Sequence, residues 1–97
     1  MEKLALLASL HAKPGKEKEV EEFLKSALPL AQAEGATIKW YAFKLGDGHF
    51  GVFDTFADEA GRQAHLTGDI AKALMAKAPE LFDTAPKIEK PEILAVK

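Results

Sequence analysis

The segment 16–34 carries a single apolar stripe, and this feature constrains the fold more than any other. Its apolar side chains recur at steps of three and four residues, the period of an α-helix: Val20, Phe23, Leu24, Ala27, Leu28 and Ala31. Several glutamates crowd the first turns, where the helix dipole favours negative charge. The pattern predicts an amphipathic helix that ends at Gly35, with a kink near residues 25–28 because Pro29 removes a backbone hydrogen bond.

Three other stretches have the character of β-strands. Residues 3–13 are rich in leucine and alanine and stop at Pro14-Gly15, a strong turn signal, so we predict a first strand there. The stretch 37–45 is aromatic and β-branched, and residues 49–56 resume its pattern after the turn pair Asp47-Gly48. The second and third stretches are predicted to form an antiparallel hairpin.

A second helix is predicted to begin after Asp58, whose side chain is suited to cap the first free backbone N–H groups. Gly68 is expected to interrupt this helix, with Asp69 capping the segment that follows. Pro79 is expected to start a separate short helical turn.

The last predicted strand covers residues 88–96, and Pro91 confines at least its beginning to a sheet edge or a bulge. The complete order is strand, helix, strand, strand, helix, strand. That order predicts an α+β fold of the ferredoxin-like βαββαβ type, a four-stranded antiparallel sheet with its helices on one face. A length of 97 residues fits a single domain, 1–97.

Large apolar side chains project from both faces of the predicted sheet, although helices cover only one. In the first strand Leu6 and Leu7 point to opposite faces, and Trp40 and Tyr41 are opposed in the second. At about 25 cal/mol per Å² of apolar surface, three or four uncovered side chains leave several kcal/mol of burial unused in a monomer. We therefore predict a homodimer packed sheet to sheet, a dimeric α+β barrel. The alternative is that these residues are simply exposed.

Composition argues against several classes of function. The net charge of -2, from 13 basic and 15 acidic residues, gives no basic surface of the kind that nucleic-acid-binding proteins concentrate. The absence of cysteine removes disulfides, thiolate metal sites and cysteine nucleophiles, and fits a cytoplasmic protein. The apolar run near the N-terminus is at the lower limit for a signal peptide, and no stretch approaches the roughly 20 apolar residues that span a membrane. No nucleic-acid or membrane partner is expected.

The stretch FGVFDTFADEAGRQAHL, residues 50–66, passes from a predicted strand into a predicted helix. Together with KPGKEKEVEEFL at the first helix and GATIKWYAFKL in the second strand, it resembles the antibiotic biosynthesis monooxygenase (ABM) domain over nearly the whole chain. Five residues match the family motif: Phe50, Asp58, Glu59, Ala64 and His65. Asp54 stands where the family often has Glu, and Phe56 where it often has Trp. The resemblance implies a small dimeric barrel related to cofactor-independent oxygenases, haem-degrading enzymes and stress-related proteins.

In the resembled family, established oxygenase and haem-degrading sites combine an Asn on the first strand with a Trp and a His on the second helix. This sequence contains no Asn. By position in the resemblance, the Asn site falls at Ala8 or Ser9, the Trp site at His65 and the later His near Met75. Haem degradation is therefore disfavoured, because its axial histidine would have to be replaced, and no cofactor is expected.

His65 is the candidate catalytic residue that remains. An imidazole can take a proton from a phenol, enol or quinol because its pKa lies near neutrality, and the resulting anion can react with oxygen. Such a base needs a partner that fixes its tautomer; Asp54 and Asp58 are the candidates, and Asp54 completes the predicted catalytic pair. The alternative is a histidine on the flank of the helix, about 100° from the stripe through Leu66 and Ile70.

The predicted substrate pocket contains Trp40, Phe50, Phe56 and Arg62. The aromatic side chains would form an apolar wall for a planar ligand, and the alternative for them is packing in the core or at the dimer interface. Arg62, the only arginine, would bind an anionic substrate group, or it would form a surface ion pair with the acidic residues that precede it.

The two other histidines are not assigned to the site. His49 follows the hairpin turn and is expected in solvent, whereas His11 ends the first strand at the barrel interior or its rim. Because the histidines are so far apart in sequence, they do not resemble a metal-ligand pair, and no metal site is predicted.

Two functions compete. The first is a cofactor-independent monooxygenase of the ABM type that acts on a small aromatic or quinol-like substrate. The second is a non-catalytic dimeric barrel that binds a small ligand or serves in stress physiology, which the missing Asn and helix Trp favour. Haem binding is a third and weaker hypothesis.

Overall fold

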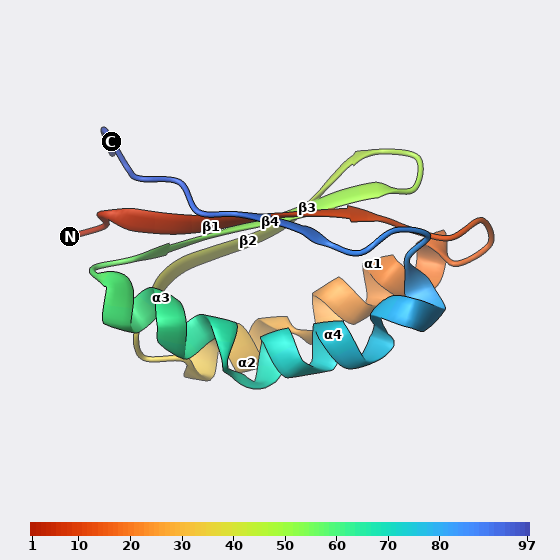
Figure 1. Ribbon diagram of the computed structural model, residues 1–97, viewed down its shortest axis with the longest axis horizontal. Helices are drawn as coiled ribbons and strands as arrows, with labels where there is room; N and C mark the ends of the chain where they lie inside the picture. Colours follow the sequence, from red (N-terminus) through yellow and green to blue (C-terminus); the bar gives the residue numbers. More distant parts are fainter.

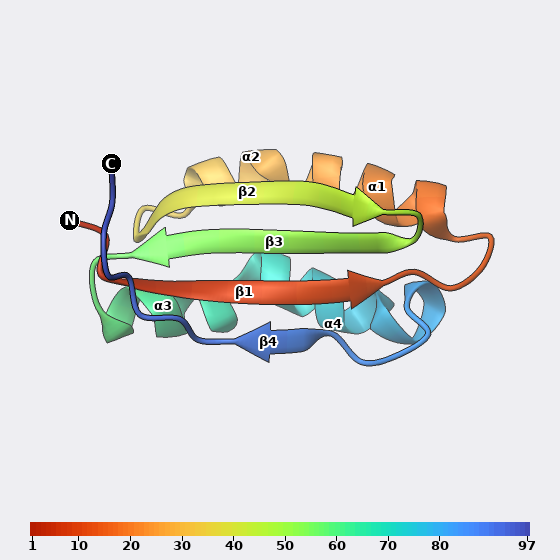
Figure 2. The ribbon, with the colours of Figure 1, turned by 90° about the horizontal axis from the view of Figure 1, so that it is seen from above.

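The computed structural model describes all residues from Met1 to Lys97 and has two layers (Figure 1). The first layer is an antiparallel sheet of β1 (Leu4–His11), β2 (Thr37–Gly46), β3 (His49–Phe56) and β4 (Lys87–Glu89). The second layer contains α1 (Glu17–Ser26), α2 (Leu28–Ala33), α3 (Glu59–Leu66) and α4 (Asp69–Leu81). All four helices lie beneath the same sheet face, as the view from above also shows (Figure 2). None of them is both long enough and apolar enough to cross a lipid bilayer.

The order of strands across the sheet is β2-β3-β1-β4, and every neighbouring pair is antiparallel. With two helical connections between strands, this is the ferredoxin-like α+β arrangement, and the predicted fold class is confirmed. The two central strands, β3 and β1, are each paired on both sides. Residues on these strands are therefore held more firmly than those on the edge strands β2 and β4.

The first predicted helix is divided in two. α1 ends at Ser26 and α2 begins at Leu28, with Ala27 between them. Pro29 is the second residue of α2, a position at which a missing backbone N–H removes no helical hydrogen bond. The predicted kink is thus confirmed in its place, but the chain starts a new helix there instead of bending one.

The second helical region divides at Gly68, as predicted. Asp58 is the N-cap of α3, and its side chain accepts a hydrogen bond from the backbone N–H of Gly61 at 2.9 Å. The predicted cap at Asp69 is wrong: Gly68 is the extended N-cap residue of α4, and Asp69 already belongs to the helix. No side chain caps α4, which follows α3 after only two residues.

Pro79 does not start a separate helical turn, so that prediction is also wrong. It lies inside α4, which continues to Leu81, and the backbone N–H of Phe82 still bonds to the carbonyl of Ala78. The carbonyl of Pro79 accepts a hydrogen bond from Lys13 Nζ at 2.6 Å. This contact ties the end of α4 to the turn that follows β1.

The prediction of a continuous last strand over 88–96 is wrong, because β4 ends at Glu89. Pro91 has no N–H to donate to the ladder, although its carbonyl accepts a hydrogen bond from the backbone N–H of Ala5 at 3.0 Å. The chain pairs with β1 again only at the single bridge between Leu4 and Glu92. The edge of the sheet beyond β4 is therefore short and interrupted.

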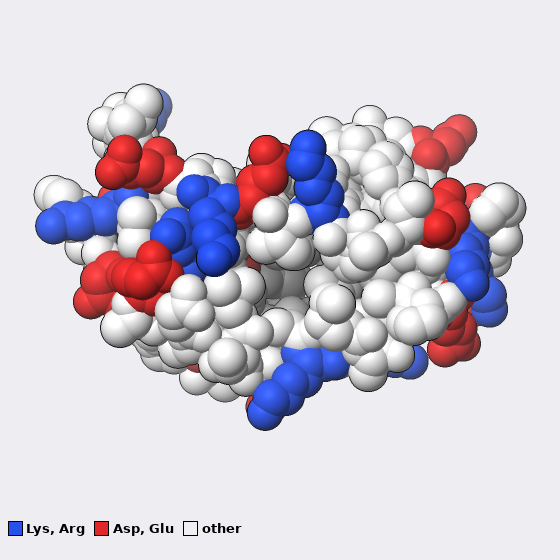
Figure 3. Space-filling model, in the orientation of Figure 1, with Lys and Arg blue, Asp and Glu red and all other residues white.

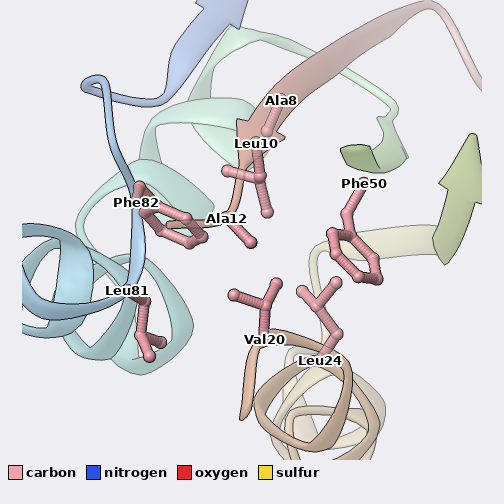
Figure 4. Close-up of a cluster of buried hydrophobic side chains, with 8 residues drawn as sticks. All are labelled: Ala8, Leu10, Ala12, Val20, Leu24, Phe50, Leu81 and Phe82. Carbon is pink, nitrogen blue, oxygen red and sulfur yellow. The ribbon is translucent and has the colours of Figure 1, made fainter. Parts of the chain in front are cut away.

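Most of the buried apolar surface lies between the sheet and α1 and α4. Figure 4 shows eight buried side chains that point toward one another from these elements and the loops beside them: Ala8, Leu10, Ala12, Val20, Leu24, Phe50, Leu81 and Phe82. A smaller group of Ala27, Ala31 and Ile70 packs against Trp40. On the helix side the indole thus packs on two small side chains, Ala27 between α1 and α2 and Ala31 of α2, together with Ile70.

The opposite face of the sheet carries an apolar row that no helix covers. Leu7 of β1 pairs with Phe53 of β3, and Phe53 pairs with Tyr41 of β2, so the three side chains lie side by side on one face. Tyr41 is 52% exposed. Trp40 pairs with Asp54 and points to the other, helix-covered face. The sequence prediction that large apolar side chains project from both faces is confirmed.

Removal of the α3 cap tests the local basis of the fold. Asp58→Ala is expected to lower the free energy of unfolding by about 1 kcal/mol, since the backbone N–H of Gly61 loses its acceptor. Urea denaturation followed by circular dichroism measures this loss. Asp69→Ala is the matched control, because Asp69 makes no cap hydrogen bond. Equal losses in the two variants would contradict the capping role.

Candidate functional site

His65 lies in the last turn of α3 and is only 8% exposed. The alternative that it sits on the flank of the helix is wrong. The flank position assumes that the helical phase of Ile70 continues back through residue 65. α3 ends at Leu66 and α4 begins at Asp69, so the two helices do not share one phase. The imidazole faces the sheet, and its ring lies 5.5 Å from the ring of the fully buried Phe56.

Two carboxylates from opposite layers meet the imidazole of His65. Nδ1 lies 2.6 Å from Oε1 of Glu34, which follows α2, and Nε2 lies 2.9 Å from Oδ2 of Asp54 on β3. The side chain of Asp54 is 1% exposed, whereas that of Glu34 is 20% exposed. The structure thus brings Asp54 to His65, as hypothesised, and gives Asp58 to the helix cap instead.

The charge of His65 follows from these contacts. Burial by itself lowers the pKa of His65, because it penalises the charged ring, but the carboxylates of Asp54 and Glu34 outweigh burial and raise the pKa to about 9. The ring is therefore an imidazolium at neutral pH, with a carboxylate at each nitrogen. In this state His65 cannot accept a proton and acts as a fixed positive charge.

Asp54 keeps unused hydrogen-bonding capacity. Its Oδ1 is buried without a partner, whereas its Oδ2 lies 2.9 Å from His65 Nε2 in the ion pair. The indole Nε1 of Trp40, which is opposite Asp54 in the sheet, is also buried without a partner. A buried polar atom without a partner costs about 1–3 kcal/mol. The site therefore has both a free acceptor and a free donor for a bound molecule.

A small cavity lies beside Asp54 and His65, between the sheet and the helices. Its volume is about 60 Å³, and 11 of the 13 residues that line it are hydrophobic, among them Leu74 of α4 and Ile88 of β4. Figure 3, which looks onto the side of α4 and β4, shows a hollow between the two layers that is bordered mostly by uncharged atoms. The cavity is thus an apolar space with an ion pair in its wall.

The aromatic residues of the predicted pocket lie at different depths. Trp40 is half-buried and lines the cavity. Phe56 does not line it and packs behind His65. Phe50 is 2% exposed and belongs to the main core, although it also lies at the bottom of an open groove between α1 and β2. Of the three aromatic residues, only Trp40 borders the cavity that contains Asp54.

Arg62 is buried and does not line the cavity. Its guanidinium lies 2.6 Å from Oε1 of Glu59 and donates hydrogen bonds to the carbonyls of Ala5 and Pro91. These contacts hold the start of α3 against β1 and the chain beyond β4. The ion pair with Glu59 that the sequence offered as the alternative is therefore present, but Arg62 itself is buried and its other hydrogen bonds go to the backbone inside the fold.

His11 and His49 are brought together by the pairing of β1 with β3. Their rings stack with centroids 4.2 Å apart, and Ser9 Oγ lies 3.2 Å from His49 Nε2. The sequence analysis treated the two histidines separately, although the hairpin register places them opposite each other. They lie on the sheet face away from the helices, far from the cavity in the fold.

Glu34 is the site residue that the sequence analysis missed. It comes directly after α2 and before Gly35, where a polar residue is ordinary, and 31 residues separate it from His65. The one feature of Glu34 that could have suggested a role is its position at the end of a helix, just before β2. No periodicity or motif in the sequence identifies it.

These features define a class: a ferredoxin-like α+β domain with a buried ionic site between sheet and helices. No protein-family model and no curated protein matches the chain. Among solved structures, the NE2512 protein of unknown function from Nitrosomonas europaea is 61% identical, with a TM-score of 0.98, and the match covers 100% of this chain and 94% of that one. The chain therefore belongs to the same family as NE2512.

More distant structures show the same fold. Rv0793 from Mycobacterium tuberculosis superposes with a TM-score of 0.85 at 14% identity, covering 97% of each chain. A protein from Caulobacter crescentus that is provisionally named an antibiotic biosynthesis monooxygenase superposes with a TM-score of 0.79 at 23% identity, covering 97% of this chain and 92% of that one. The ABM resemblance is thus confirmed at the level of the fold.

The double pairing of His65 predicts a pH dependence of stability. The pKa of His65 in the folded chain, about 9, is above its ordinary value of 6.5. The two ion pairs of the protonated ring therefore stabilise the folded chain fully below pH 6.5. This contribution to the free energy of unfolding, at most about 3 kcal/mol, is lost as the pH rises through 9. Urea unfolding at pH 6 and pH 10 measures the loss.

His65→Gln is the comparison, because groups that titrate near pH 10 elsewhere contribute equally to both proteins. The variant is expected to lose less stability than the native chain over this range. Parallel losses in the two proteins would show that His65 is not held protonated in the folded chain.

Proposed function

We propose that this protein is a cofactor-independent monooxygenase of the ABM type that acts on a small aromatic or quinol-like molecule with an acidic hydroxyl group. The observation that supports this most is the carboxylate of Asp54, which is buried at an apolar cavity with no hydrogen-bond donor at Oδ1. A hydroxyl group on an apolar molecule is the donor that fits such a site.

The proton-accepting role falls to Asp54 in this proposal. Both nitrogens of His65 face carboxylates, and its raised pKa of about 9 keeps it charged at neutral pH. A substrate hydroxyl would give its proton to Asp54, and the oxyanion left behind would lie near the imidazolium of His65, which stabilises it. The proposal keeps the predicted pair of His65 and Asp54, but Asp54 now accepts the proton and His65 stabilises the oxyanion.

The weak basicity of a carboxylate restricts the substrate. Each pKa unit by which the hydroxyl exceeds the acceptor costs about 1.4 kcal/mol, and a simple phenol exceeds an ordinary aspartate by about six units. Only part of such a gap can be offset by a neighbouring imidazolium. Substrates whose anion is spread over an extended ring system are therefore favoured over a simple phenol.

The oxygen step needs no external reductant. An activated ring methylene group reacts with one molecule of dioxygen to give a ketone and one molecule of water. One electron passes from the substrate anion to dioxygen, and the carbon radical combines with the superoxide that forms. One oxygen atom then stays on the carbon as the carbonyl oxygen, and the other leaves as water with the two methylene hydrogens. The substrate supplies all the electrons, so the protein has to provide only deprotonation, positioning and a dry environment.

A non-catalytic ligand-binding barrel is the alternative, and the double pairing of His65 favours it. With a carboxylate at each nitrogen, the site needs only a hydroxyl donor to complete its hydrogen bonds, and binding alone achieves this. A bound hydroxylated ligand that consumes no oxygen would be the result that supports this alternative.

Oxygen uptake in a Clark-type cell tests the oxygenase proposal. Anthrone, which has the ring methylene group that this step needs, is added to the native chain, and the uncatalysed rate is subtracted. Asp54→Asn keeps the shape of the side chain but removes the proton acceptor, and we expect kcat/KM to fall at least tenfold. Asp47→Asn, in the exposed hairpin turn, is the control and should keep the native rate. Unchanged uptake in Asp54→Asn would exclude the proposed acceptor.

We also propose that two copies of the chain pack through their sheet faces. The apolar row of Leu7, Phe53 and Tyr41 supports this, because a second sheet would cover it. The C-terminal tail leaves the sheet on the same side as this row (Figure 1), and its Leu94 is 91% exposed. A stable interface of this kind buries about 800 Å² on each partner.

Sedimentation equilibrium at micromolar concentration tests the dimer. The native chain is expected at twice its chain mass. Phe53→Glu places a charge in the middle of the apolar row and should shift the protein to the monomer. Met75→Glu, on the exposed side of α4, is the matched control and should remain dimeric. A native monomer would overturn this proposal.

A further inference from the structure

A groove much larger than the cavity lies on the other side of the molecule, between α1 and the edge strand β2. Its volume is about 530 Å³, within the range of about 300–1,000 Å³ that is typical of ligand pockets, and 7 of its 10 lining residues are hydrophobic. The cavity beside Asp54, at about 60 Å³, is smaller than a cavity of about 150 Å³ that holds benzene. The cavity by itself therefore cannot hold an aromatic ring, whereas the groove can.

Two parallel walls shape the groove. One wall is a stripe at helical spacing along α1 and the start of α2, from Glu21 to Leu28. The other wall is formed by alternate residues of β2 that face the helices: Trp40, Ala42 and Lys44. Ala42 is exposed although it points toward the helix layer, because its small side chain does not fill the space.

The two ends of the groove differ in chemistry. At one end Glu21 pairs with Lys25 at 3.1 Å and with Lys44 at 3.8 Å, so a single carboxylate is shared by two cations. At the other end lie Leu28 and Trp40. Lys44 lies four steps along β2 from Trp40, a distance of about 13 Å. An elongated apolar molecule with one anionic end matches this layout.

Trp40 is the partition between groove and cavity. It lines both spaces, packs on alanines on the helix side and is directly opposite Asp54 in the sheet. No hydrogen bond holds its indole in place, because Nε1 is buried without an acceptor. A ligand hydroxyl that reached this point would accept from Trp40 Nε1 and donate to Asp54, satisfying both.

We propose that the groove is the outer half of a binding site for an elongated aromatic hydroxy acid, whose hydroxyl group reaches between Trp40 and Asp54 at the cavity. The carboxylate lies between Lys25 and Lys44, the ring system lies over Ala42, and the hydroxyl group reaches Asp54. This inference deepens the proposed function, since the hydroxyl is the group that Asp54 would deprotonate. The cavity on the opposite side has a volume of only about 60 Å³, less than an aromatic ring needs.

Three probes separate the two ends of the site. 4′-Hydroxybiphenyl-4-carboxylate carries both groups, 4-phenylphenol lacks the carboxylate, and biphenyl-4-carboxylate lacks the hydroxyl. By isothermal titration calorimetry we expect loss of the carboxylate to weaken binding about threefold and loss of the hydroxyl to weaken it at least tenfold. The indole N–H resonance of Trp40, the only tryptophan, should move further with the two hydroxylated probes than with biphenyl-4-carboxylate, which has no group to accept from Nε1 there. Equal affinity for all three probes would overturn the proposal.

Charge variants test the anionic end. In the Lys25→Gln/Lys44→Gln double variant, the threefold advantage of the carboxylate should disappear, while 4-phenylphenol binds as in the native chain. Lys18→Gln/Lys72→Gln removes two exposed lysines outside the groove and is the matched control. A loss of the carboxylate advantage in both double variants would mean that general charge, and not the groove, attracts the probe.

Plugging variants test the route. Ala42→Leu fills the groove and should weaken binding of the hydroxy acid at least tenfold, whereas Ile88→Phe narrows the opposite hollow and should leave it unchanged. The reverse result would place the ligand on the β4 side and overturn the proposal. Because these assays measure binding, they are independent of turnover. Probes that bind as expected without oxygen uptake would support the groove and contradict the oxygenase proposal. Oxygen uptake that does not change in Ala42→Leu would support the oxygenase proposal and contradict the groove.

Discussion

The meeting of two carboxylates at one buried imidazole is the constraint that organises this protein. Glu34 ends the first helical pair, His65 ends α3, and Asp54 lies on a central strand, so the contact joins three segments that are distant in sequence. A buried carboxylate without a countercharge would cost several kcal/mol, and removal of one partner of a buried pair typically costs 3–5 kcal/mol. The site therefore contributes to the stability of the fold, and substitutions in it have to be judged with a stability measurement beside any activity measurement.

Much of the fold could be predicted because local rules and tertiary structure agree. The Asp58 cap, the break at Gly68 and the restart of the helix at Pro29 all follow from backbone hydrogen bonding that is decided within a few residues. The last strand was predicted too long because Pro91 affects pairing with another strand, which a local pattern does not show. Pro79 was misplaced for the converse reason: packing of the end of α4 on the core, through Leu81, holds the helix together past the proline.

The residues of the candidate site were predictable only in part, for the same reason. Asp54 and His65 are eleven residues apart on adjacent elements, so a strand followed by a helix that packs back on it brings them together, and sequence reasoning could find them. Glu34 could not be found, because its contact with His65 depends on where α2 ends relative to α3. Glu34 adds to the effect of Asp54 in raising the pKa of His65, so both carboxylates keep the ring charged at neutral pH. The missed residue therefore bears on the role that His65 takes in the proposed function.

Charge balance connects the cavity with the groove. With Glu34 and Asp54 ionised and His65 protonated, the three groups carry a net charge of −1. In the proposed step, proton transfer from a substrate hydroxyl to Asp54 would bring the sum over the three groups to zero and leave the negative charge on the ligand, so the total with the ligand would stay at −1. The imidazolium would face Glu34 and Asp54 before the step, and Glu34 and the new oxyanion after it. A second anionic group next to the three would meet only repulsion. In the proposed site an acidic substituent would be favourable at the far end of the groove, where Lys25 and Lys44 share Glu21, so the proposed ligand carries its hydroxyl and its anionic group at opposite ends.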